Sequence, residues 1–249
     1  MSTRWPSQLW IVRHGQSAGN VARDAAHEAG LQRIDIAERD MDVPLSALGE
    51  QQAEALGRWF AAMPPDDRPD VVLTSPYLRA IRTAELIGAA GGLSGEARLG
   101  HPDERLRERE FGVLDRLTRD GIVALFPEEA ARRASLGKFY HRPPGGESWC
   151  DVVLRLRSVL DTLSLHYSGR RVLIVGHQVV VLCLRYLLET LTEADILAVD
   201  AEGDVANCGV TEYRRSDEGL ERVRYNFVAP LEDEGAPVTS APDQAAGAR

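Results

Sequence analysis

Short apolar runs alternate along this chain with longer segments of helical periodicity. Residues 9–12, 71–73 and 172–175 are continuously apolar, which is typical of strands in a sheet that is covered on both faces. Between the first two runs, residues 46–63 place apolar side chains at the spacing of an amphipathic helix. Strands that alternate with helices form βαβ units, so the pattern predicts an α/β protein with a mostly parallel sheet.

Two further helices are predicted by the residues at which they would begin. Ser148 is followed three positions later by Asp151, and Thr192 is followed in the same way by Asp195. Both pairs resemble a capping box, in which the two side chains bond the free backbone N–H groups of a first helical turn.

The second half of the chain adds a buried helix and two late strands. Residues 179–191 are strongly apolar but too short to span a bilayer, so they are predicted to form a helix of the core. Residues 210–213 and 223–227 are predicted to be strands at an edge or in a hairpin.

Two segments have no clear periodicity. Residues 21–41 are charged and rich in alanine, which leaves a helical excursion and a mobile loop as alternatives. Residues 229–249 contain three prolines and little apolar content, so they are predicted to be a disordered tail. Without repeats or an internal linker before that tail, residues 1–228 are expected to form one domain.

Composition narrows the class of protein. The 249 residues are 44% hydrophobic and 27% charged, with a formal net charge of −9. This acidic balance disfavours a nucleic-acid partner, although a local arginine cluster can still bind a small anion. Three unpatterned cysteines and the lack of a targeting or membrane signal favour a cytoplasmic protein.

Polar residues follow each of the three apolar runs. Arg13 and His14 follow the first run, Arg79 comes shortly after the second, and His177 follows the third. Ligands of open α/β sheets bind beyond the carboxyl ends of the strands, so these side chains are expected to converge there if the strands are parallel.

This set of residues suits phosphate chemistry. Arginine forks match phosphate oxygens, and a histidine among cationic donors can act as phosphate ligand or as nucleophile. A proton donor for the leaving oxygen is also needed, and Glu108 and Glu110 in a charged segment are the two candidates. Taken singly, each of these residues would be an ordinary surface or core residue.

The motifs resemble those of the histidine phosphatase superfamily, the phosphoglycerate mutase-like proteins. The resemblance runs in the family's order over about residues 8–215. Its motifs are Arg13-His14-Gly15-Gln16-Ser17 with Asn20, Asp42 to Gly49, Ser75 to Ala80, Leu106 to Gly112, Gly145 to Ser148, and Gly176-His177. The resemblance implies a three-layer α/β/α sandwich with a mostly parallel central sheet.

It also implies roles for the matching residues. His14 would be the nucleophile that forms a phosphohistidine, and Arg13, Arg79 and His177 would hold the phosphoryl group. Glu108 occupies the motif position of the general acid and base. The catalytic set is therefore expected to be His14, Glu108 and His177.

Asn20 and Gln178 are expected to line the phosphate pocket or its rim, beside Arg13 and Arg79. The mechanism implied by the family needs no metal and no cofactor, and the histidines and cysteines lack paired ligand spacing. The histidines outside the motifs, of which His141 is one, are expected to lie on the surface.

Several departures favour hydrolysis of a phosphomonoester over mutase chemistry. His177-Gln178-Val179 stands where the mutases have His-Gly-Asn, and Phe111 stands where they have tyrosine. Residues 112–118 and 144–148 resemble the fructose-2,6-bisphosphatase branch instead. Mutase-type phosphoryl transfer remains the first alternative, and an inactive phosphate-binding or interaction module remains the second.

The expected partner is a small phosphorylated metabolite, with neither nucleic acid nor membrane, and a homodimer is left open. Residues 21–41 are expected to cap the pocket and contribute to substrate choice. Residues 119–140 would cover the site from another side. Nearby basic side chains could then meet a second anionic group; they are Arg132, Arg133, Lys138 and Arg142.

Overall fold

The computed structural model describes residues 4–94, 97–99 and 102–240. The strands are β1 Gln8–Arg13, β2 Val71–Thr74, β3 Arg98–Leu99, β4 Arg171–Gly176, β5 Val210–Arg215 and β6 Leu220–Phe227. The helices are α1 Ala18–Glu28, α2 Ala47–Ala61, α3 Leu78–Ala89, α4 Arg119–Leu125, α5 Pro127–Tyr140, α6 Trp149–His166, α7 Gln178–Leu188, α8 Glu193–Glu202 and α9 Ala229–Asp233. Short 3₁₀ turns cover Asp40–Asp42, Pro65–Asp67, Glu104–Leu106 and Gly112–Leu114.

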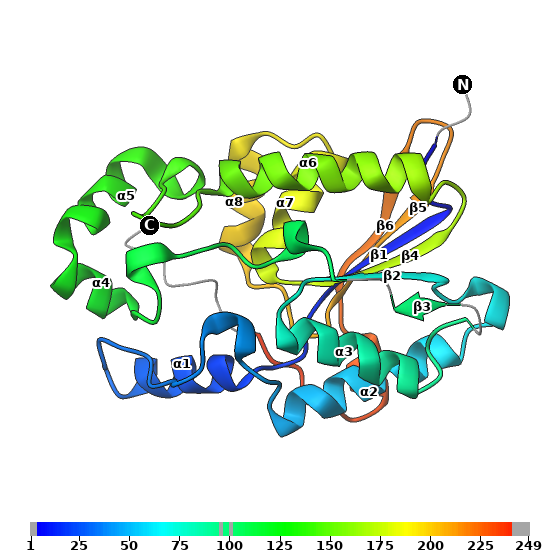
Figure 1. Ribbon diagram of the computed structural model, residues 1–249, viewed down its shortest axis with the longest axis horizontal. Helices are drawn as coiled ribbons and strands as arrows, with labels where there is room; N and C mark the ends of the chain where they lie inside the picture. Colours follow the sequence, from blue (N-terminus) through cyan, green and yellow to red (C-terminus); the bar gives the residue numbers. More distant parts are fainter. Residues whose placement is uncertain (1–3, 95–96, 100–101, 241–249) are drawn as a thin grey trace.

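In the described part of the chain, the strands form one six-stranded sheet in the order β3-β2-β4-β1-β5-β6. The first four strands are parallel, while β5 and β6 add an antiparallel hairpin at one edge. Helices α6, α7 and α8 cover one face of the sheet, and α2 and α3 cover the other (Figure 1). The predicted α/β/α sandwich with a mostly parallel sheet is confirmed.

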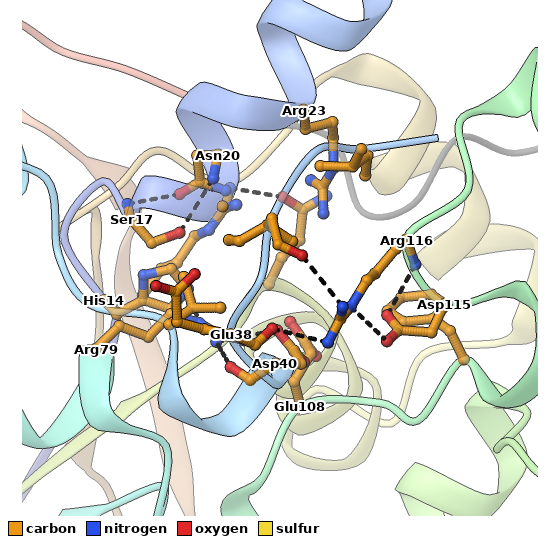
Figure 2. Close-up of a pocket in the computed structure, with 17 residues that line it drawn as sticks. His14, Ser17, Asn20, Arg23, Glu38, Asp40, Arg79, Glu108, Asp115 and Arg116 are labelled. Atoms are coloured by element: carbon orange, nitrogen blue, oxygen red, sulfur yellow. Dashed lines mark hydrogen bonds and ion pairs between the residues drawn. The ribbon is translucent and has the colours of Figure 1, made fainter. Parts of the chain in front are cut away.

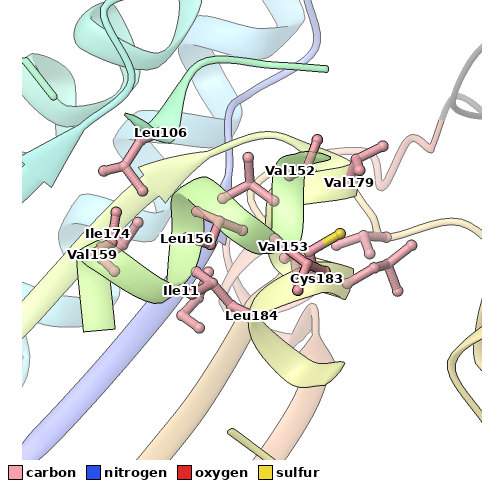
Figure 3. Close-up of a cluster of buried hydrophobic side chains, with 14 of the residues drawn as sticks. Ile11, Leu106, Val152, Val153, Leu156, Val159, Ile174, Val179, Cys183 and Leu184 are labelled. Carbon is pink, nitrogen blue, oxygen red and sulfur yellow. The ribbon is translucent and has the colours of Figure 1, made fainter. Parts of the chain in front are cut away.

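The continuous apolar runs are explained by the two covered faces. Successive strand residues point to opposite sides, so Ile11 and Ile174 enter the core under α6 and α7, while Trp10 and Val175 enter the core under α2 and α3. Figure 3 shows Ile11 and Ile174 close to side chains of α6, among them Leu156. All five of these side chains are inaccessible to solvent, so the sheet is held from both sides.

The predicted helix starts are confirmed. Ser148 accepts from the backbone N–H of Asp151, whose side chain bonds back to the amide of Ser148, and Thr192 and Asp195 form the same capping box at α8. Residues 179–191 contain most of α7, which is buried from Gln178 to Arg185 and half-buried over its last turn. No helix in the described residues is long and apolar enough to cross a membrane.

Residues 21–41 combine both of the alternatives that the sequence left open. They start within α1 and continue as an irregular segment to the 3₁₀ turn at Asp40–Asp42. We call residues 31–38 of this segment the strap. The backbone N–H of Ile34 donates to the carbonyl of Arg116 at 2.9 Å, and that of Thr118 donates to the carbonyl of Gln32 at 3.1 Å, so the strap is fixed to the chain before α4.

The disordered tail predicted from residue 229 is wrong for residues 229–240. These residues form α9 and an extended stretch that packs against α2, and Leu231 is completely buried in the core. One apolar anchor and specific hydrogen bonds hold a segment whose composition alone predicts disorder. Residues 241–249 of the predicted tail lie outside the described residues.

Candidate active site

The carboxyl ends of three parallel strands meet at one pocket. His14 follows β1, Ser75 follows β2 and His177 follows β4, so the strand order β2-β4-β1 brings them to the same edge of the sheet. The pocket beside them encloses about 730 Å³ of empty space, including the solvent at its mouth. Figure 2 shows His14 and Arg79 at one end of this pocket.

His14 is held in a single tautomer. Its Nδ1 lies 2.7 Å from the carbonyl oxygen of Gly15, which can only accept a hydrogen bond, so Nδ1 carries the proton. Its Nε2 accepts a hydrogen bond from Nε of Arg79 at 3.2 Å. Burial, together with the charges of Arg79 and Arg13, lowers the pKa of His14 well below its usual value. The ring is therefore neutral and turns an unprotonated Nε2 toward Arg79.

Two buried arginines flank this histidine. Arg79 bonds His14 on one side, and on the other it contacts the Asp40 carbonyl at 2.5 Å and the Asp40 carboxylate at 3.0 Å. Arg13 donates to the side-chain oxygen of Gln178 at 2.8 Å and to the carbonyl of Val205 at 2.5 Å. Both guanidinium groups are thus oriented by protein oxygens, which makes a rigid basic end of the pocket.

His177 packs against the same centre. Its ring centroid lies 5.1 Å from that of His14, and its Nε2 lies 2.7 Å from the hydroxyl of Ser75. Its Nδ1 is buried without a hydrogen-bond partner and lies 3.8 Å from a carboxylate oxygen of Glu108. Burial, Arg79 and His14 lower the pKa of His177 well below its usual value, so this ring is also neutral and keeps one nitrogen for a ligand.

The structure separates the two candidate carboxylates. Glu108 lines the pocket, and one of its oxygens accepts the backbone N–H of Arg109 at 2.9 Å. Glu110 is exposed, lies outside that lining, and accepts from the hydroxyl of Tyr77 at 3.2 Å. Only Glu108 therefore lies beside the two histidines.

Asn20 and Gln178 also line the pocket. Asn20 is the third residue of α1, and its side-chain oxygen accepts the backbone N–H of Ser17 at 2.9 Å in a capping box. Gln178 is the first residue of α7, where its oxygen accepts from Arg13 and its amide donates to Asp204 at 2.8 Å. Both amides are buried and fixed by local helix geometry.

A close backbone contact sets the course of the loop after β1. A Cβ on Gly15 would lie 2.4 Å from the carbonyl oxygen of Gly49, and a Cβ on Gly49 would lie 1.9 Å from that of Gln16. Since neither position has room for a side chain, the first turn of α2 packs directly on the loop that carries His14.

The strap forms the outer wall of the pocket, as the sequence hypothesis of a cap over the site requires. Ile34, Ile36 and Glu38 of the strap line the pocket. Arg116 fixes it from the opposite wall by donating to the carbonyls of Ile36 at 3.1 Å and Glu38 at 2.8 Å. Arg116 has a left-handed backbone, with φ of 57°, which turns its side chain toward the strap.

The expectation that basic side chains around α5 face the pocket is wrong. Arg132 pairs with Glu129 at 3.1 Å and Lys138 with Asp200 at 2.5 Å. Arg142 pairs with the carboxylate of Asp151, and Arg133 lines a separate small cavity.

The surface position expected for His141 is also wrong. The residue is 1% exposed, and its Nε2 lies 3.1 Å from the carboxylate of Glu129.

Several pocket residues were not found from the sequence. Arg23 and Arg116 supply the basic groups of the outer pocket, while Glu38, Asp40 and Asp115 add carboxylates. These residues lie in segments that are far apart along the chain and belong to no motif, so nothing in the sequence indicates that they form one cluster.

Among the described residues, no group of three or more histidine, cysteine, aspartate or glutamate side chains is arranged to hold a metal ion. The pocket instead joins neutral histidines to oriented arginines and one adjacent carboxylate. Fold and site thus define an α/β protein whose ligand pocket lies at the carboxyl edge of a mostly parallel sheet.

The chain belongs to the histidine phosphatase superfamily (branch 1), whose family model matches residues 9–228. It is 32% identical to the 2,3-bisphosphoglycerate-dependent phosphoglycerate mutase of Rhizobium meliloti, over 77% of this chain and 84% of the relative. It is also 31% identical to the 6-phosphofructo-2-kinase/fructose-2,6-bisphosphatase of Gallus gallus, over 76% of this chain. The chain spans 34% of the length of that bifunctional relative.

Solved structures give the same picture. The native structure of a mycobacterial glucosyl-3-phosphoglycerate phosphatase matches with a TM-score of 0.68 and 28% identity, covering 89% of this chain and 99% of that one. Relatives and structural neighbours are therefore phosphatases or mutases by name, which agrees with phosphatase activity in general terms.

Proposed function

We propose that this protein hydrolyses a phosphomonoester of a small metabolite through a phosphohistidine on His14. The observation that carries the proposal is the orientation of that ring: Nδ1 is bonded to Gly15, and the unprotonated Nε2 lies beside Arg79. A neutral, pre-oriented imidazole next to a guanidinium is the arrangement that attack on phosphorus needs.

In the first step, the lone pair of His14 Nε2 forms a bond to phosphorus as the bond to the ester oxygen breaks. Glu108 in its protonated form gives its proton to the departing alcohol oxygen. Arg13 and Arg79 neutralise charge on the phosphoryl oxygens. With its Nε2 accepting from the Ser75 hydroxyl, the neutral His177 would donate to the same group through its unpartnered Nδ1.

In the second step, water attacks phosphorus while Glu108, now a carboxylate, takes a proton from that water. The P–N bond breaks, its electron pair returns to Nε2, and inorganic phosphate leaves. No metal or cofactor enters either step.

Hydrolysis of an aryl phosphate at mildly acidic pH, without added metal, tests the proposal. Wild-type protein should release phosphate. With an aryl phosphate labelled on phosphorus and a quench without acid, which would hydrolyse a phosphohistidine, the label should be found on His14. The His14→Ala variant should do neither, and a chelator should leave the wild-type rate unchanged. Turnover retained by His14→Ala would remove His14 as the nucleophile.

Mutase-type transfer is the second candidate, because a relative of similar identity is named a 2,3-bisphosphoglycerate-dependent phosphoglycerate mutase. Incubation with 3-phosphoglycerate and 2,3-bisphosphoglycerate separates the two. Release of inorganic phosphate supports hydrolysis, whereas formation of the 2-phospho isomer supports transfer. Failure to form any phosphoenzyme would favour the inactive phosphate-binding module instead.

A further inference from the structure

Most residues of the outer half of the pocket lie outside the family motifs. The strap supplies Ile34 and Ile36, and Val43 and Phe111 complete an apolar lining around the path from His14 to solvent. A phosphoryl group held at the inner end would place its alcohol part against these side chains.

The charges of the pocket are unevenly distributed. Its lining contains four arginines and four carboxylates, namely Arg13, Arg23, Arg79, Arg116, Glu38, Asp40, Glu108 and Asp115. Arg13 and Arg79 contact the inner residues Gln178 and His14, where a phosphoryl group would use their charge. The outer half is left with two arginines and three carboxylates. One of these carboxylates, Asp40, pairs with Arg79 at 3.0 Å, so the outer half has a net negative charge when a bound phosphoryl group takes up the charge of Arg79.

The two outer arginines do not offset this charge. Both terminal nitrogens of Arg116 donate to strap carbonyls, and its Nε lies 3.7 Å from the carboxylate of Asp115. Arg23 reaches the pocket from α1 (Figure 2) and is the second basic group of the outer lining. With both guanidinium groups counted as charged, the three carboxylates still exceed them by one.

The outer carboxylates repel one another even without a ligand. Burial raises the pKa of Asp115, and the charge of Asp40 raises it further, while Arg116 and Arg23 act in the opposite direction. A further anion in this region would add to the repulsion.

We propose that this outer half selects phosphomonoesters whose alcohol part is uncharged and partly apolar, and disfavours substrates with a second anionic group. The inference rests on the proposed function, because it concerns the substrate of the same site. It also reverses the expectation that a second anion would meet basic residues of α5.

Two substrates with one carbon skeleton test the charge selection. Glycerol 3-phosphate and 3-phosphoglycerate differ in a hydroxymethyl group against a carboxylate. We expect kcat/KM to be about tenfold higher for glycerol 3-phosphate, since one like charge in a shared pocket has an effect of this order. Equal values, or a preference for 3-phosphoglycerate, would overturn the inference.

Variants of the outer carboxylates test whether these residues cause the preference between the two substrates. The double variant Glu38→Gln with Asp115→Asn removes two negative charges and leaves two arginines with one carboxylate in the outer half. The preference for glycerol 3-phosphate should therefore disappear or invert. The amide introduced at position 115 keeps an oxygen that can accept the backbone N–H of Arg116, as the aspartate does. Asp217→Asn, on the exposed turn between β5 and β6, is the matched control and should keep the wild-type ratio. An unchanged ratio in the double variant would also count against the proposal.

The contribution of the apolar lining is tested with a variant of Ile36. Ile36→Ser should lower kcat/KM several-fold for phenyl phosphate while leaving glycerol 3-phosphate little changed. Comparing the variant with the wild type on each substrate cancels the different reactivity of the two leaving groups. Equal losses for both substrates would show that Ile36 supports the fold of the strap rather than substrate choice.

Binding measurements test this inference independently of the proposed function. Kd values for the three phosphates, measured by calorimetry with the His14→Ala variant, need no catalysis. If the wild type hydrolyses nothing, the proposed function fails, while the same order of Kd values still supports the selection and an inverted order rejects it.

Discussion

Asn207 connects the C-terminal segment to His14: its side-chain amide donates to the backbone carbonyl of His14 at 3.0 Å, and its backbone N–H donates to the carbonyl of Thr239 at 2.8 Å. The Thr239 hydroxyl donates to Asn207 at 3.0 Å and accepts from Gln52 at 2.9 Å. Gln52 in turn accepts the backbone N–H of Gln16 at 2.9 Å. Two fully buried amides therefore link residue 239 to both ends of the loop that carries His14.

Removing the hydroxyl of Thr239 should weaken this loop. The Thr239→Val variant leaves a buried oxygen of Asn207 without its donor, so we expect the free energy of unfolding to fall by about 1–3 kcal/mol. Displacement of the His14 loop should also lower kcat/KM for an aryl phosphate several-fold. Urea unfolding and steady-state kinetics measure the two effects.

Thr239→Ser is the matched control, because it keeps the oxygen that bonds Asn207 and Gln52. It should stay close to wild type in both measurements. If the valine and serine variants behave alike, the hydroxyl has no part in positioning the loop.

This connection shows where prediction from the sequence reaches its limit. The strands, their polar ends and the capping boxes are local patterns, and residues within a few positions of one another determine them. Thr239 meets Gln52 across 187 positions and Asn207 across 32. Nothing near residue 239 signals these partners, so low apolar content was misread as disorder.

The same reason explains the outer pocket. His14 and Arg79 belong to motifs, and their convergence follows from the parallel strands that carry them. Arg116 enters the pocket lining because its backbone turns and the strap folds against it, which depends on contacts between residues about 80 positions apart. Lys138 has the positive charge expected of a residue that binds a second anion, but it forms an ion pair with Asp200 instead.

The contact between α2 and the loop that carries His14 gives a second prediction, in which the change in stability is opposite to the one that helix propensity alone predicts. Alanine in place of Gly49 would favour the helix by about 1 kcal/mol on propensity alone. Its Cβ would lie 1.9 Å from the carbonyl oxygen of Gln16, however, so the backbone must move. We expect Gly49→Ala to be less stable than wild type by about 2 kcal/mol, measured by urea unfolding.

The control is Gly203→Ala, at the end of α8, where an added Cβ has no neighbour within 4 Å. This variant should unfold within about 0.5 kcal/mol of wild type. A stabilised Gly49→Ala variant would show that the loop tolerates the displacement.

The two carboxylates near the site allow a paired test of the proposed proton donor. Glu108→Gln keeps the shape of the side chain but removes its proton, and we expect kcat for an alkyl phosphate to fall about 10²–10³-fold. An aryl phosphate with an acidic leaving group needs less protonation and should lose less. Glu110→Gln, which lies outside the pocket lining, should keep near wild-type kcat on both substrates. A larger loss in Glu110→Gln would transfer the role to that residue.

The buried histidines predict how stability depends on pH. Burial and neighbouring positive charge lower the folded-state pKa of His14 and His177 well below the usual 6.5. Well above pH 6.5 both rings are neutral in the folded and unfolded chain and add no pH dependence. Below it the unfolded chain binds protons that the folded protein excludes, so the free energy of unfolding should fall with pH by up to about 1.4 kcal/mol per pH unit for each ring.

Urea unfolding at several pH values between 7.5 and 5.0, with His177→Asn beside the wild type, isolates this effect. The variant lacks one proton-binding site in the unfolded chain and should lose stability less steeply below pH 6.5. His141, whose pKa burial also lowers, is present in both proteins and cancels from the comparison. Parallel slopes would mean that His177 binds its proton equally in both states. In that case the ring would be charged in the folded site at mildly acidic pH, and its partner there would be Glu108 as a carboxylate rather than as an acid.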